Sequence, residues 1–336
     1  MKKMNFTLGI FLLLITTASF SQQEPMRIEG YAQGTTYHIT YFDKQNRDLQ
    51  PEIEKILKDF DLSVSTYIPN SIISRINSND KDVVVDKYFI ACFNKAKEVW
   101  KNTGGAFDPT VYPLVNMWGW GPGKKQKIEK EKVDSILKFV GFQLIELNGN
   151  KIVKKDPRVA LDFNAFAQGY SVDVVSDFLN TKGITSYIVE IGGEVYAKGK
   201  KSDGNNWAVG IEKPIDNKDS ANPFKAIAKL EDLAISTSGN YRRFIIIDGV
   251  KYAHHIDPKS GYPTKNNLLS ASVFAKECIS SDANATGILV MGLEKAKVFL
   301  EAHKELQAYL IYSDDKGNYQ IYETPGLKSI VSETNE

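Results

Sequence analysis

Residues 144–154 read LIELNGNKIVK, and this stretch decides the class of fold. Two short runs, 144–147 and 151–154, flank Asn148-Gly149, a dipeptide typical of a tight β-hairpin turn. Residues 243–253, RFIIIDGVKYA, repeat the pattern around Asp248-Gly249. Because a hairpin joins two antiparallel strands, these stretches predict mixed or antiparallel sheet rather than regular strand-helix-strand units.

The chain on either side of these hairpins alternates between strand and helix patterns. Residues 27–32 and 36–42 predict another pair of strands, and residues 161–170 predict a strand that runs into a helix. The helical pattern, with apolar residues three and four apart, covers residues 51–61, 86–101, 166–179, 282–291 and 294–303. Together these patterns predict an α+β fold.

The composition is that of an ordinary globular protein. The 336 residues are 42% hydrophobic and 25% charged, and 42 Lys and Arg against 41 Asp and Glu leave a formal net charge of +1. A net charge this small creates no long-range electric field that would attract the phosphates of a nucleic acid. We therefore expect no nucleic-acid partner. The two cysteines, Cys92 and Cys278, exclude a disulfide-rich scaffold and a four-cysteine zinc site, and leave one bridge or two buried thiols open.

The N-terminus has the pattern of a secretory signal peptide. Lys2 and Lys3 precede an apolar run over residues 8–15 and then small residues up to Ser21. The run is far shorter than the ~20 residues that a membrane span needs, and no cysteine follows it to carry a lipid. We therefore expect cleavage after residues 1–21 and a soluble, exported, periplasmic protein that is not an integral membrane protein. The remainder suffices for one large domain or two joined lobes, with residues 119–133 as a lysine-rich surface excursion.

Glycine-punctuated segments carry the candidate chemistry. Gly104-Gly105 precedes Trp118 and Trp120, so backbone and flat rings could contact a ligand, or the segment is a tight turn before a helix with core tryptophans. Gly192-Gly193 similarly indicates either close backbone approach to a ligand or a simple bulge or turn.

Two segments combine acidic residues with helix starts. Asp162 and Asn164 stand where a helix cap belongs, and a helix N-terminus also accepts anions such as a pyrophosphate. Asp282 and Thr286 are four residues apart on one helix face and would suit Mg²⁺ with waters and phosphates completing its shell. The alternative is that Asp282 is an acid at a helix N-terminus and Thr286 a core residue.

The segment HHIDPKSG at residues 254–261 holds half of the chain's four histidines beside Asp257. A His and Asp pair suits general base catalysis, whereas an Asp-Pro turn with a capping aspartate explains the same residues structurally. Two familiar motifs are absent from the sequence. The lysine after Gly119, Gly121 and Gly123 lacks the spacing of a phosphate loop, and no Gly-x-Ser-x-Gly nucleophile elbow occurs.

Taken in order, these segments resemble the FAD:protein FMN transferases, the ApbE-type family once labelled thiamine-biosynthesis lipoproteins. The resemblance extends from residue 30 to about residue 312. The segments that carry it are residues 30–37, 65–67, 105–110, 162–170, 192–194, 237–241, 254–261 and 282–286. Each motif is weak alone, and their number and shared order carry the resemblance.

The resemblance implies a fold and an activity. The fold is α+β, with mixed or antiparallel sheets and flanking helices, related to the T-fold and forming one two-lobed catalytic domain over residues 22–330. The activity is Mg²⁺-dependent: FAD is the substrate, FMN is transferred through its phosphate to a threonine hydroxyl of a partner protein, and AMP is released. The implied acceptors carry a Ser/Thr-Gly-Ala-Thr-like motif in membrane redox complexes such as Na⁺-translocating NADH:quinone oxidoreductase.

The resemblance also implies roles for individual residues. The positions that contact FAD in the family are Gln33, Tyr67, Ala106, Phe107, Asp108, Asp162, Gln168 and Ile256. The metal positions are the main-chain oxygen of Ala165 and the side chains of Asp282 and Thr286. His254 falls where the family needs a histidine for transfer, with Asp257 to orient it.

Three positions depart from the family pattern. Gln33 stands where Met is frequent, Gln168 where a basic residue is frequent, and Ala285 where some members have an additional acidic metal ligand. Two other functions stay open at this stage. Water in place of the threonine would make the protein an FAD pyrophosphatase that yields FMN and AMP, and loss of catalysis would leave a flavin-binding or storage protein.

Overall fold

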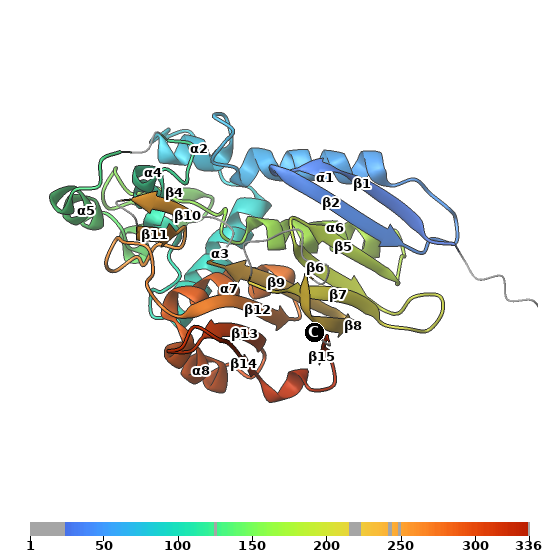
Figure 1. The fold of residues 1–336 in the computed structure, drawn as a ribbon. Helices are drawn as coiled ribbons and strands as arrows, with labels where there is room; N and C mark the ends of the chain where they lie inside the picture. The colour runs from blue at the N-terminus through green and yellow to red at the C-terminus, as the bar shows by residue number, and fades with distance from the viewer. Residues whose placement is uncertain (1–23, 124–125, 215–222, 241–243, 248–249, 335–336) are drawn as a thin grey trace, which may run out of the picture.

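The chain folds around an eight-stranded sheet with the strand order β1-β2-β5-β6-β9-β12-β13-β14 (Figure 1). A computed structural model describes residues 24–123, 126–214, 223–240, 244–247 and 250–334, with 244–247 and 250–251 as backbone only. Every strand pair described is antiparallel. The strands of this sheet are β1 (Met26–Ala32), β2 (Thr35–Tyr41), β5 (Tyr187–Ile191), β6 (Glu194–Lys198), β9 (Leu233–Gly239), β12 (Leu268–Ala275), β13 (Gln307–Ser313) and β14 (Tyr319–Glu323).

Three smaller sheets complete the β structure. Strands β15 (Val331–Glu333), β8 (Phe224–Leu230) and β7 (Trp207–Glu212) form one of them. The two predicted hairpins are confirmed as β3 (Ile145–Asn148) with β4 (Lys151–Lys154), and β10 (Phe244–Ile247) with β11 (Val250–Ala253). The Asp248-Gly249 turn lies outside the described residues. Each hairpin forms its own two-stranded sheet and adds no strand to the large one.

The predicted helices are confirmed with small shifts at their ends. They are α1 (Gln50–Val64), α3 (Lys87–Asn102), α6 (Ala167–Thr181), α7 (Cys278–Met291) and α8 (Leu293–Ala302), and the structure adds α2 (Ile72–Asn77), α4 (Tyr112–Trp118) and α5 (Lys130–Leu137). Two short 3₁₀ turns, Pro109–Val111 and Phe142–Leu144, flank the excursion that carries α5, and a third is Pro325–Leu327. Asp86 caps α3 by accepting a hydrogen bond from the backbone N–H of Phe89.

Side-chain alternation decides which face of the large sheet is covered by helices. In β2, Tyr37, Ile39 and Tyr41 are buried against α1 and α6. Further along the sheet, alternate residues of β12 such as Val273 pack on α7 and α8. Phe274, which points to the opposite face, packs instead in a cluster with residues of β7 and β8. The large sheet therefore lies between a helical layer and the small three-stranded sheet.

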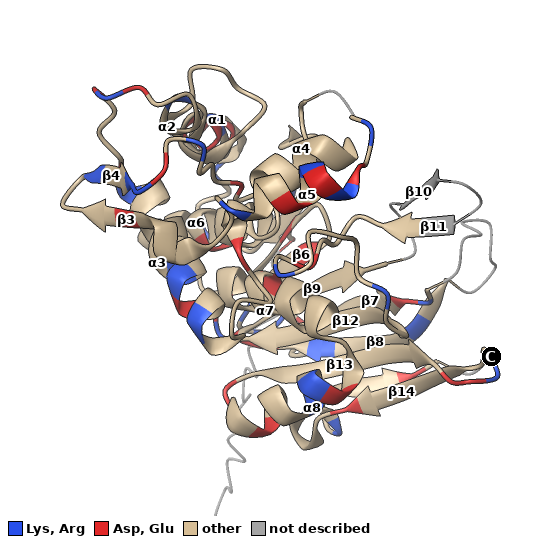
Figure 2. Ribbon diagram, turned by 90° about the vertical axis from the view of Figure 1, so that its left-hand side faces the viewer, with Lys and Arg blue, Asp and Glu red and all other residues tan. Residues whose placement is uncertain are grey.

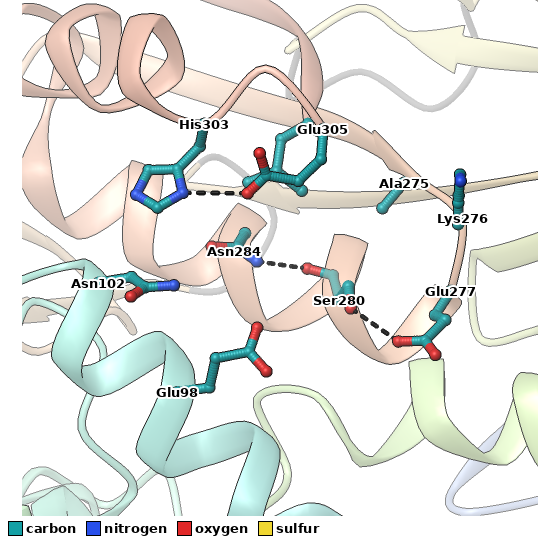
Figure 3. Close-up of a pocket in the computed structure, with 10 residues that line it drawn as sticks. Glu98, Asn102, Ala275, Lys276, Glu277, Ser280, Asn284, His303 and Glu305 are labelled. Carbon is teal, nitrogen blue, oxygen red and sulfur yellow. Dashed lines mark hydrogen bonds and ion pairs between the residues drawn. The ribbon is translucent and has the colours of Figure 1, made fainter.

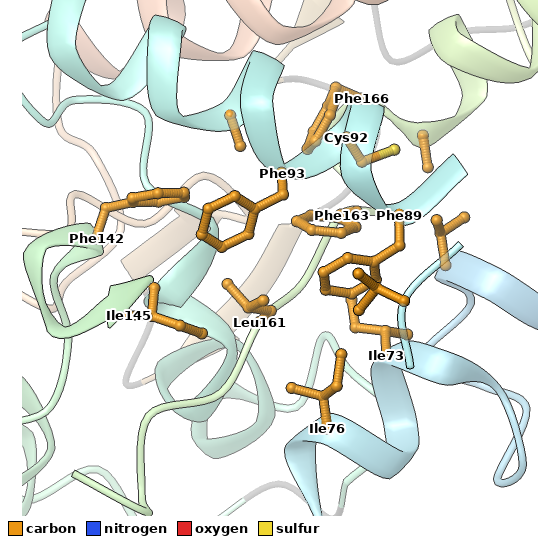
Figure 4. Packing of buried hydrophobic residues seen from close by; sticks show 14 of the residues in the cluster. Ile73, Ile76, Phe89, Cys92, Phe93, Phe142, Ile145, Leu161, Phe163 and Phe166 are labelled. Carbon is orange, nitrogen blue, oxygen red and sulfur yellow. The ribbon is translucent and has the colours of Figure 1, made fainter. Parts of the chain in front are cut away.

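A second core lies beneath the helices α2 and α3 (Figure 4). Phe89 and Phe93 of α3 pack against Phe163, Phe166 and their neighbours. The predicted strand at residues 161–163 is wrong. Leu161 exchanges two hydrogen bonds with the side chain of Asn77, so a side chain takes the place of a neighbouring strand.

The structure also bears on the expectations about the cysteines, the charges and the membrane. Cys92 and Cys278 are both buried free thiols, so no bridge joins them. Charges of both signs are interspersed over the face in Figure 2, as the balanced composition predicts. The predicted signal peptide lies outside the described residues. In the described part of the chain, no helix is both long enough and apolar enough to cross a membrane.

Candidate active site

The start of helix α6 brings together most of the segments singled out from the sequence (Figure 1). Asn164 donates a hydrogen bond from Nδ2 to Thr66 Oγ1 at 3.0 Å, and Asp162 N donates to the Pro109 carbonyl at 2.8 Å. On α6 itself, Gly169 N donates to Asp282 of α7 at 2.9 Å. Segments as far apart in the chain as Thr66 and Asp282 thus meet at one point.

The oxygens predicted to hold a metal lie side by side. Thr286 Oγ1 donates to the Ala165 carbonyl oxygen at 3.2 Å and lies 3.2 Å from Ser238 Oγ of β9. Asp282 lies one helical turn before Thr286 on the same face of α7. The structure therefore groups one carboxylate, one hydroxyl and one main-chain carbonyl, all of them oxygen donors of the kind that Mg²⁺ prefers.

Asp282 occupies an unusual environment for a carboxylate. Its side chain is only 6% exposed, and burial raises its pKa to about 7, with the nearby Asp173 adding to the rise and the Gly169 N–H opposing it. The alternative in which Asp282 begins the helix is wrong, because α7 starts at Cys278. The acid at that N-terminus is Asp173 of α6, whose carboxylate accepts hydrogen bonds from Cys278 N and Ile279 N at 2.8 Å each.

Close packing of α6 on α7 holds these groups together. An added Cβ on Gly169 would lie 2.6 Å from Asp282 Cβ and 2.6 Å from the Cys278 carbonyl oxygen. Only glycine therefore permits this approach of the two helices. The expected caps of α6 are wrong: Phe166 is at the N-cap position, and Asp162 Oδ1 instead accepts from Asn164 N at 2.8 Å within the preceding turn.

The predicted flavin contacts Gln33 and Gln168 border the same helix start. Gln33 and Gly34 form the two-residue turn between β1 and β2, with positive φ angles of 54° and 76°. Gln33 Oε1 accepts a hydrogen bond from Ser171 Oγ of α6 at 3.2 Å, and the Gln33 side chain also donates to the carboxylate of Asp61 in α1. Gln168 lies against Gly192, where an added Cβ would come within 2.8 Å of its Nε2.

The turn at Gly192-Gly193 is a tight connection between β5 and β6, as the simpler interpretation predicted, with Ile191 paired to Glu194. Glu190 accepts hydrogen bonds from Gly193 N at 2.7 Å and is paired with His38 Nδ1 at 2.6 Å. His38 and Glu190 were not predicted as a pair from the sequence. Their pairing across neighbouring strands depends on the register of β2 against β5, in which His38 lies opposite Glu190.

Asp108 and Asp162 have structural partners. Asp108 accepts from Thr110 N and Oγ1 and from Phe142 N, and burial raises its pKa. Burial also raises the pKa of Asp162 to about 6. The carboxylate of Asp108 therefore stabilises the turn over residues 108–110, and that of Asp162 stabilises the turn over residues 162–164.

Three further residues predicted to contact the flavin lie on the loops around this helix start. Phe107 is buried, and Gly287 of α7 faces it, since an added Cβ there would lie 3.4 Å from Phe107 Cβ and 2.9 Å from Thr103 Cγ2. Ala106 beside it is half-buried. Tyr67 is 60% exposed, which leaves much of its ring open to a ligand.

The loop with the two histidines packs against the segment that follows the double glycine. Trp118 Nε1 donates to the Gly261 carbonyl at 3.0 Å, and Trp118 itself is a buried core residue, as the simpler interpretation predicted. Ile256 is buried and forms a β-bridge with Pro263. Asp257 Oδ1 accepts from Lys259 N at 2.9 Å, which confirms the Asp-Pro turn.

His254 and His255 lie with their ring centroids 3.9 Å apart. His255 is the more buried, and its Nδ1 lies 2.9 Å from Asn240 Oδ1. The role of Asp257 in orienting His254 stays a prediction. Asn240 lies in the segment 237–241 that contributes to the family resemblance, but only the fold brings it to the histidine loop.

A separate pocket of about 240 Å³ lies between α3, α7 and the end of α8 (Figure 3). Its lining includes Ser280 and Asn284, which face away from Asp282 and Thr286 on α7 because two residues correspond to about 200° around a helix. None of the predicted site residues lines this pocket. It is therefore distinct from the group of oxygens at the start of α6.

The donor set fits a magnesium ion better than a transition metal. Among the residues described, no group of three or more His, Cys, Asp and Glu side chains could hold a metal. Mg²⁺ needs no such group, since it keeps several waters and takes one or two carboxylates together with substrate phosphates. The adjacent oxygens of Ala165 and Thr286, 3.2 Å apart, are close to the ~3 Å that separates neighbouring ligands around Mg²⁺.

Comparisons with known proteins place this chain in a family. The model of the ApbE family matches residues 33–310. A curated relative from Vibrio cholerae serotype O1, named FAD:protein FMN transferase, is 33% identical over 336 residues, covering 98% of this chain and 99% of the relative. One from Haemophilus influenzae with the same name is 34% identical over 324 residues, covering 92% and 93%.

Solved structures agree with these matches. The flavin transferase ApbE from Vibrio cholerae superposes with a TM-score of 0.82 at 34% identity, covering 91% of this chain and 99% of that one. The apo form of the Pseudomonas stutzeri flavinyl transferase ApbE gives a TM-score of 0.81 at 29% identity, covering 91% and 96%. The α+β class with antiparallel sheets is therefore shared with solved members, and the chain belongs to the ApbE family.

Proposed function

We propose that the protein is a Mg²⁺-dependent FAD:protein FMN transferase. It cleaves the pyrophosphate of FAD, attaches FMN through a phosphoester bond to a threonine of an acceptor protein, and releases AMP. One observation carries the proposal: the carbonyl of Ala165 and the hydroxyl of Thr286 meet at 3.2 Å beside the carboxylate of Asp282, in a chain whose relatives are named for this reaction.

The metal would be held by the Ala165 carbonyl, Asp282 and Thr286. When bound, Mg²⁺ would neutralise charge on the pyrophosphate and stabilise the departing AMP. The contribution of the chain is to hold the three oxygens in place. Gly169 allows α6 and α7 to approach, and its N–H hydrogen-bonds one oxygen of Asp282.

FAD would lie over the start of α6. The positions proposed to contact it are Gln33, Tyr67, Ala106, Phe107, Asp108, Asp162, Gln168 and Ile256. The exposed ring of Tyr67 offers a flat surface to a ring of the ligand. Asp108 and Asp162 would act mainly through the backbone turns that they fix, because their oxygens accept hydrogen bonds within the protein.

His254 would serve as the general base. In the proposed step the acceptor hydroxyl oxygen attacks the phosphorus on the FMN side, and the bond from this phosphorus to the bridging oxygen breaks. The hydroxyl proton goes to His254, and the electron pair leaves on the phosphate of AMP. Asp257 would orient His254 from the turn that follows it.

The sequence pattern of residues 1–21 supports export, with residues 22–330 as the catalytic domain. We propose a periplasmic location, and acceptors that are exported domains of membrane redox complexes with a Ser/Thr-Gly-Ala-Thr-like motif. This proposal rests on the signal-peptide pattern and on the family resemblance.

The test uses residues 22–336 with FAD, Mg²⁺ and an acceptor domain that carries the motif, followed by intact mass. The acceptor is expected to gain the mass of FMN minus water, and an acceptor with its threonine replaced by alanine should gain nothing. Replacing Mg²⁺ by EDTA should stop the labelling. Labelling that persists in EDTA would overturn the metal dependence, and the absence of any labelling of acceptors with the motif would overturn the transferase.

A further inference from the structure

We propose that His255, held by Asn240, is a positioning residue that fixes the ring of His254 for proton transfer. The inference rests on the proposed function of His254 and goes beyond it. It assigns a role to His255 and to Asn240, for which the family resemblance implies no role. The structural basis is a chain of contacts that begins at strand β12 and ends on the ring of His254.

The contacts start with Asn240, at the end of β9. Its backbone N–H donates to the Leu269 carbonyl at 2.9 Å, and its side-chain Nδ2 donates to the Leu268 carbonyl at 3.1 Å. Both ends of the residue are therefore tied to β12. Its remaining group, Oδ1, lies 2.9 Å from Nδ1 of His255.

These partners determine which nitrogen of His255 carries the proton. A carbonyl oxygen only accepts, so the amide nitrogen of Asn240 must face Leu268 and its oxygen must face His255. Nδ1 of His255 is therefore the protonated nitrogen, and Nε2 has the lone pair. Thr264 N also donates to the His255 carbonyl at 2.9 Å, so backbone and ring are both fixed.

The fixed ring of His255 packs against the ring of His254 and limits its orientation. The ring centroids are 3.9 Å apart, with an angle of 47° between the planes. His255 is 8% exposed, and burial lowers its pKa well below the ordinary value, with His254 as a second cause. His255 therefore stays neutral, and a proton taken from the acceptor hydroxyl stays on His254, because two imidazolium rings at this distance would repel.

The first test compares two substitutions at position 240. Asn240→Leu removes the acceptor oxygen at similar size, whereas Asn240→Gln keeps an uncharged amide whose oxygen can accept from His255. Asn240→Leu should lower the kcat of acceptor labelling by about 10-fold with the KM for FAD within about 2-fold, since supporting partners of this kind contribute 10- to 100-fold. Asn240→Gln should stay within about 3-fold of wild type. His303→Phe, at the end of α8, is the matched control and should leave kcat unchanged.

The second test reads the tautomer directly in the metal-free, substrate-free protein. The chain has four histidines, so ¹⁵N spectra of the rings are simple, and the loss of signals in His255→Phe assigns His255. A neutral ring protonated at Nδ1 from pH 6 to 8 is expected. A ring protonated at Nε2, or one charged in this range, would overturn the proposal.

The outcomes separate this inference from the proposed function. A wild-type protein that labels no acceptor overturns the proposed function. An active wild type in which Asn240→Leu leaves kcat unchanged, or raises KM instead, overturns only the positioning role of His255.

Discussion

Substituting Gly169 by alanine should disable the proposed metal site while leaving the protein folded. The added Cβ would lie 2.6 Å from Asp282 Cβ and from the Cys278 carbonyl oxygen, whereas ordinary contact begins at 3.4 Å. Because the Cys278 oxygen belongs to backbone, no side-chain rotation relieves the contact. Helix α7 must therefore move away from α6 by about 0.8 Å.

This movement is large on the scale of magnesium coordination. Ala165 lies just before α6 and Thr286 lies on α7, so the 3.2 Å between their oxygens should open toward 4 Å. Mg²⁺ binds at about 2.0–2.1 Å with near-octahedral geometry, so one of the two oxygens is lost as a ligand. We expect Mg²⁺ affinity to fall by at least ~10-fold and the rate of labelling by roughly 10²-fold.

Global stability should change little in the same variant. Overpacking costs about 1–3 kcal/mol, and replacing a helical glycine by alanine returns about 1 kcal/mol. Magnesium binding would be measured by calorimetry, stability by urea unfolding in EDTA, and activity by labelling of the acceptor. Asp177→Ala, on the exposed side of α6, is the matched control and should bind and label as wild type.

A Gly169→Ala variant that binds Mg²⁺ and labels the acceptor like wild type would show that the close approach of α6 and α7 is not needed for the proposed metal site. Should this variant unfold, Thr286→Val gives the same test, because it removes the hydroxyl and keeps the shape of the side chain. Unchanged magnesium affinity in Thr286→Val would then contradict the site.

Three further predictions concern charge and proton transfer. Asp282→Asn should weaken Mg²⁺ binding and reduce turnover by at least ~10-fold, since the carboxylate among the proposed ligands is lost; an unchanged magnesium titration would exclude it as a ligand. His254→Ala should keep FAD affinity within a few-fold and lower the rate of acceptor labelling by ~10²-fold or more. Loss of FAD binding in this variant, or a greater loss of rate in His255→Ala, would show that His254 is not the general base. Burial raises the pKa values of Asp173 and Asp282 to about 7, so the folded state holds more protons than the unfolded state between about pH 4 and 7. In EDTA the free energy of unfolding should therefore fall less between pH 5 and 8 in Asp282→Asn than in wild type, and identical pH dependence would contradict the raised pKa of Asp282.

The parts of the fold that sequence predicts well are those that depend on neighbouring residues. The strand pair β1-β2 and the hairpins around Asn148-Gly149 and Asp248-Gly249 need only short turns, and the five longest predicted helices follow from apolar spacing. Strand β9, by contrast, reads LAISTSG and was not predicted as a strand. Its strand character comes from pairing with β6 and β12, whose residues are distant in the sequence.

In the candidate site, too, features that depend on local spacing were predicted, and contacts between distant segments were not. The helical spacing of Asp282 and Thr286 was visible in the sequence, and the family resemblance implied the Ala165 carbonyl. The structure shows that this oxygen lies 3.2 Å from Thr286 Oγ1. Asp162 was interpreted as a helix cap because its spacing suits one, yet the helix begins at Ala167 and the carboxylate serves a turn. Asp173, which does cap a helix, caps one more than 100 residues away, so no local pattern reveals it.

The most direct test of the account follows both nucleotide products with and without an acceptor domain. The protein, FAD and Mg²⁺ are incubated, AMP and free FMN are quantified over time, and the acceptor is weighed by intact mass. The account predicts AMP release that depends on the acceptor, equals the FMN bound to the acceptor threonine, and leaves little free FMN. AMP and free FMN released at the same rate without an acceptor would contradict transfer and indicate an FAD pyrophosphatase, whereas intact, tightly bound FAD under every condition would indicate flavin storage.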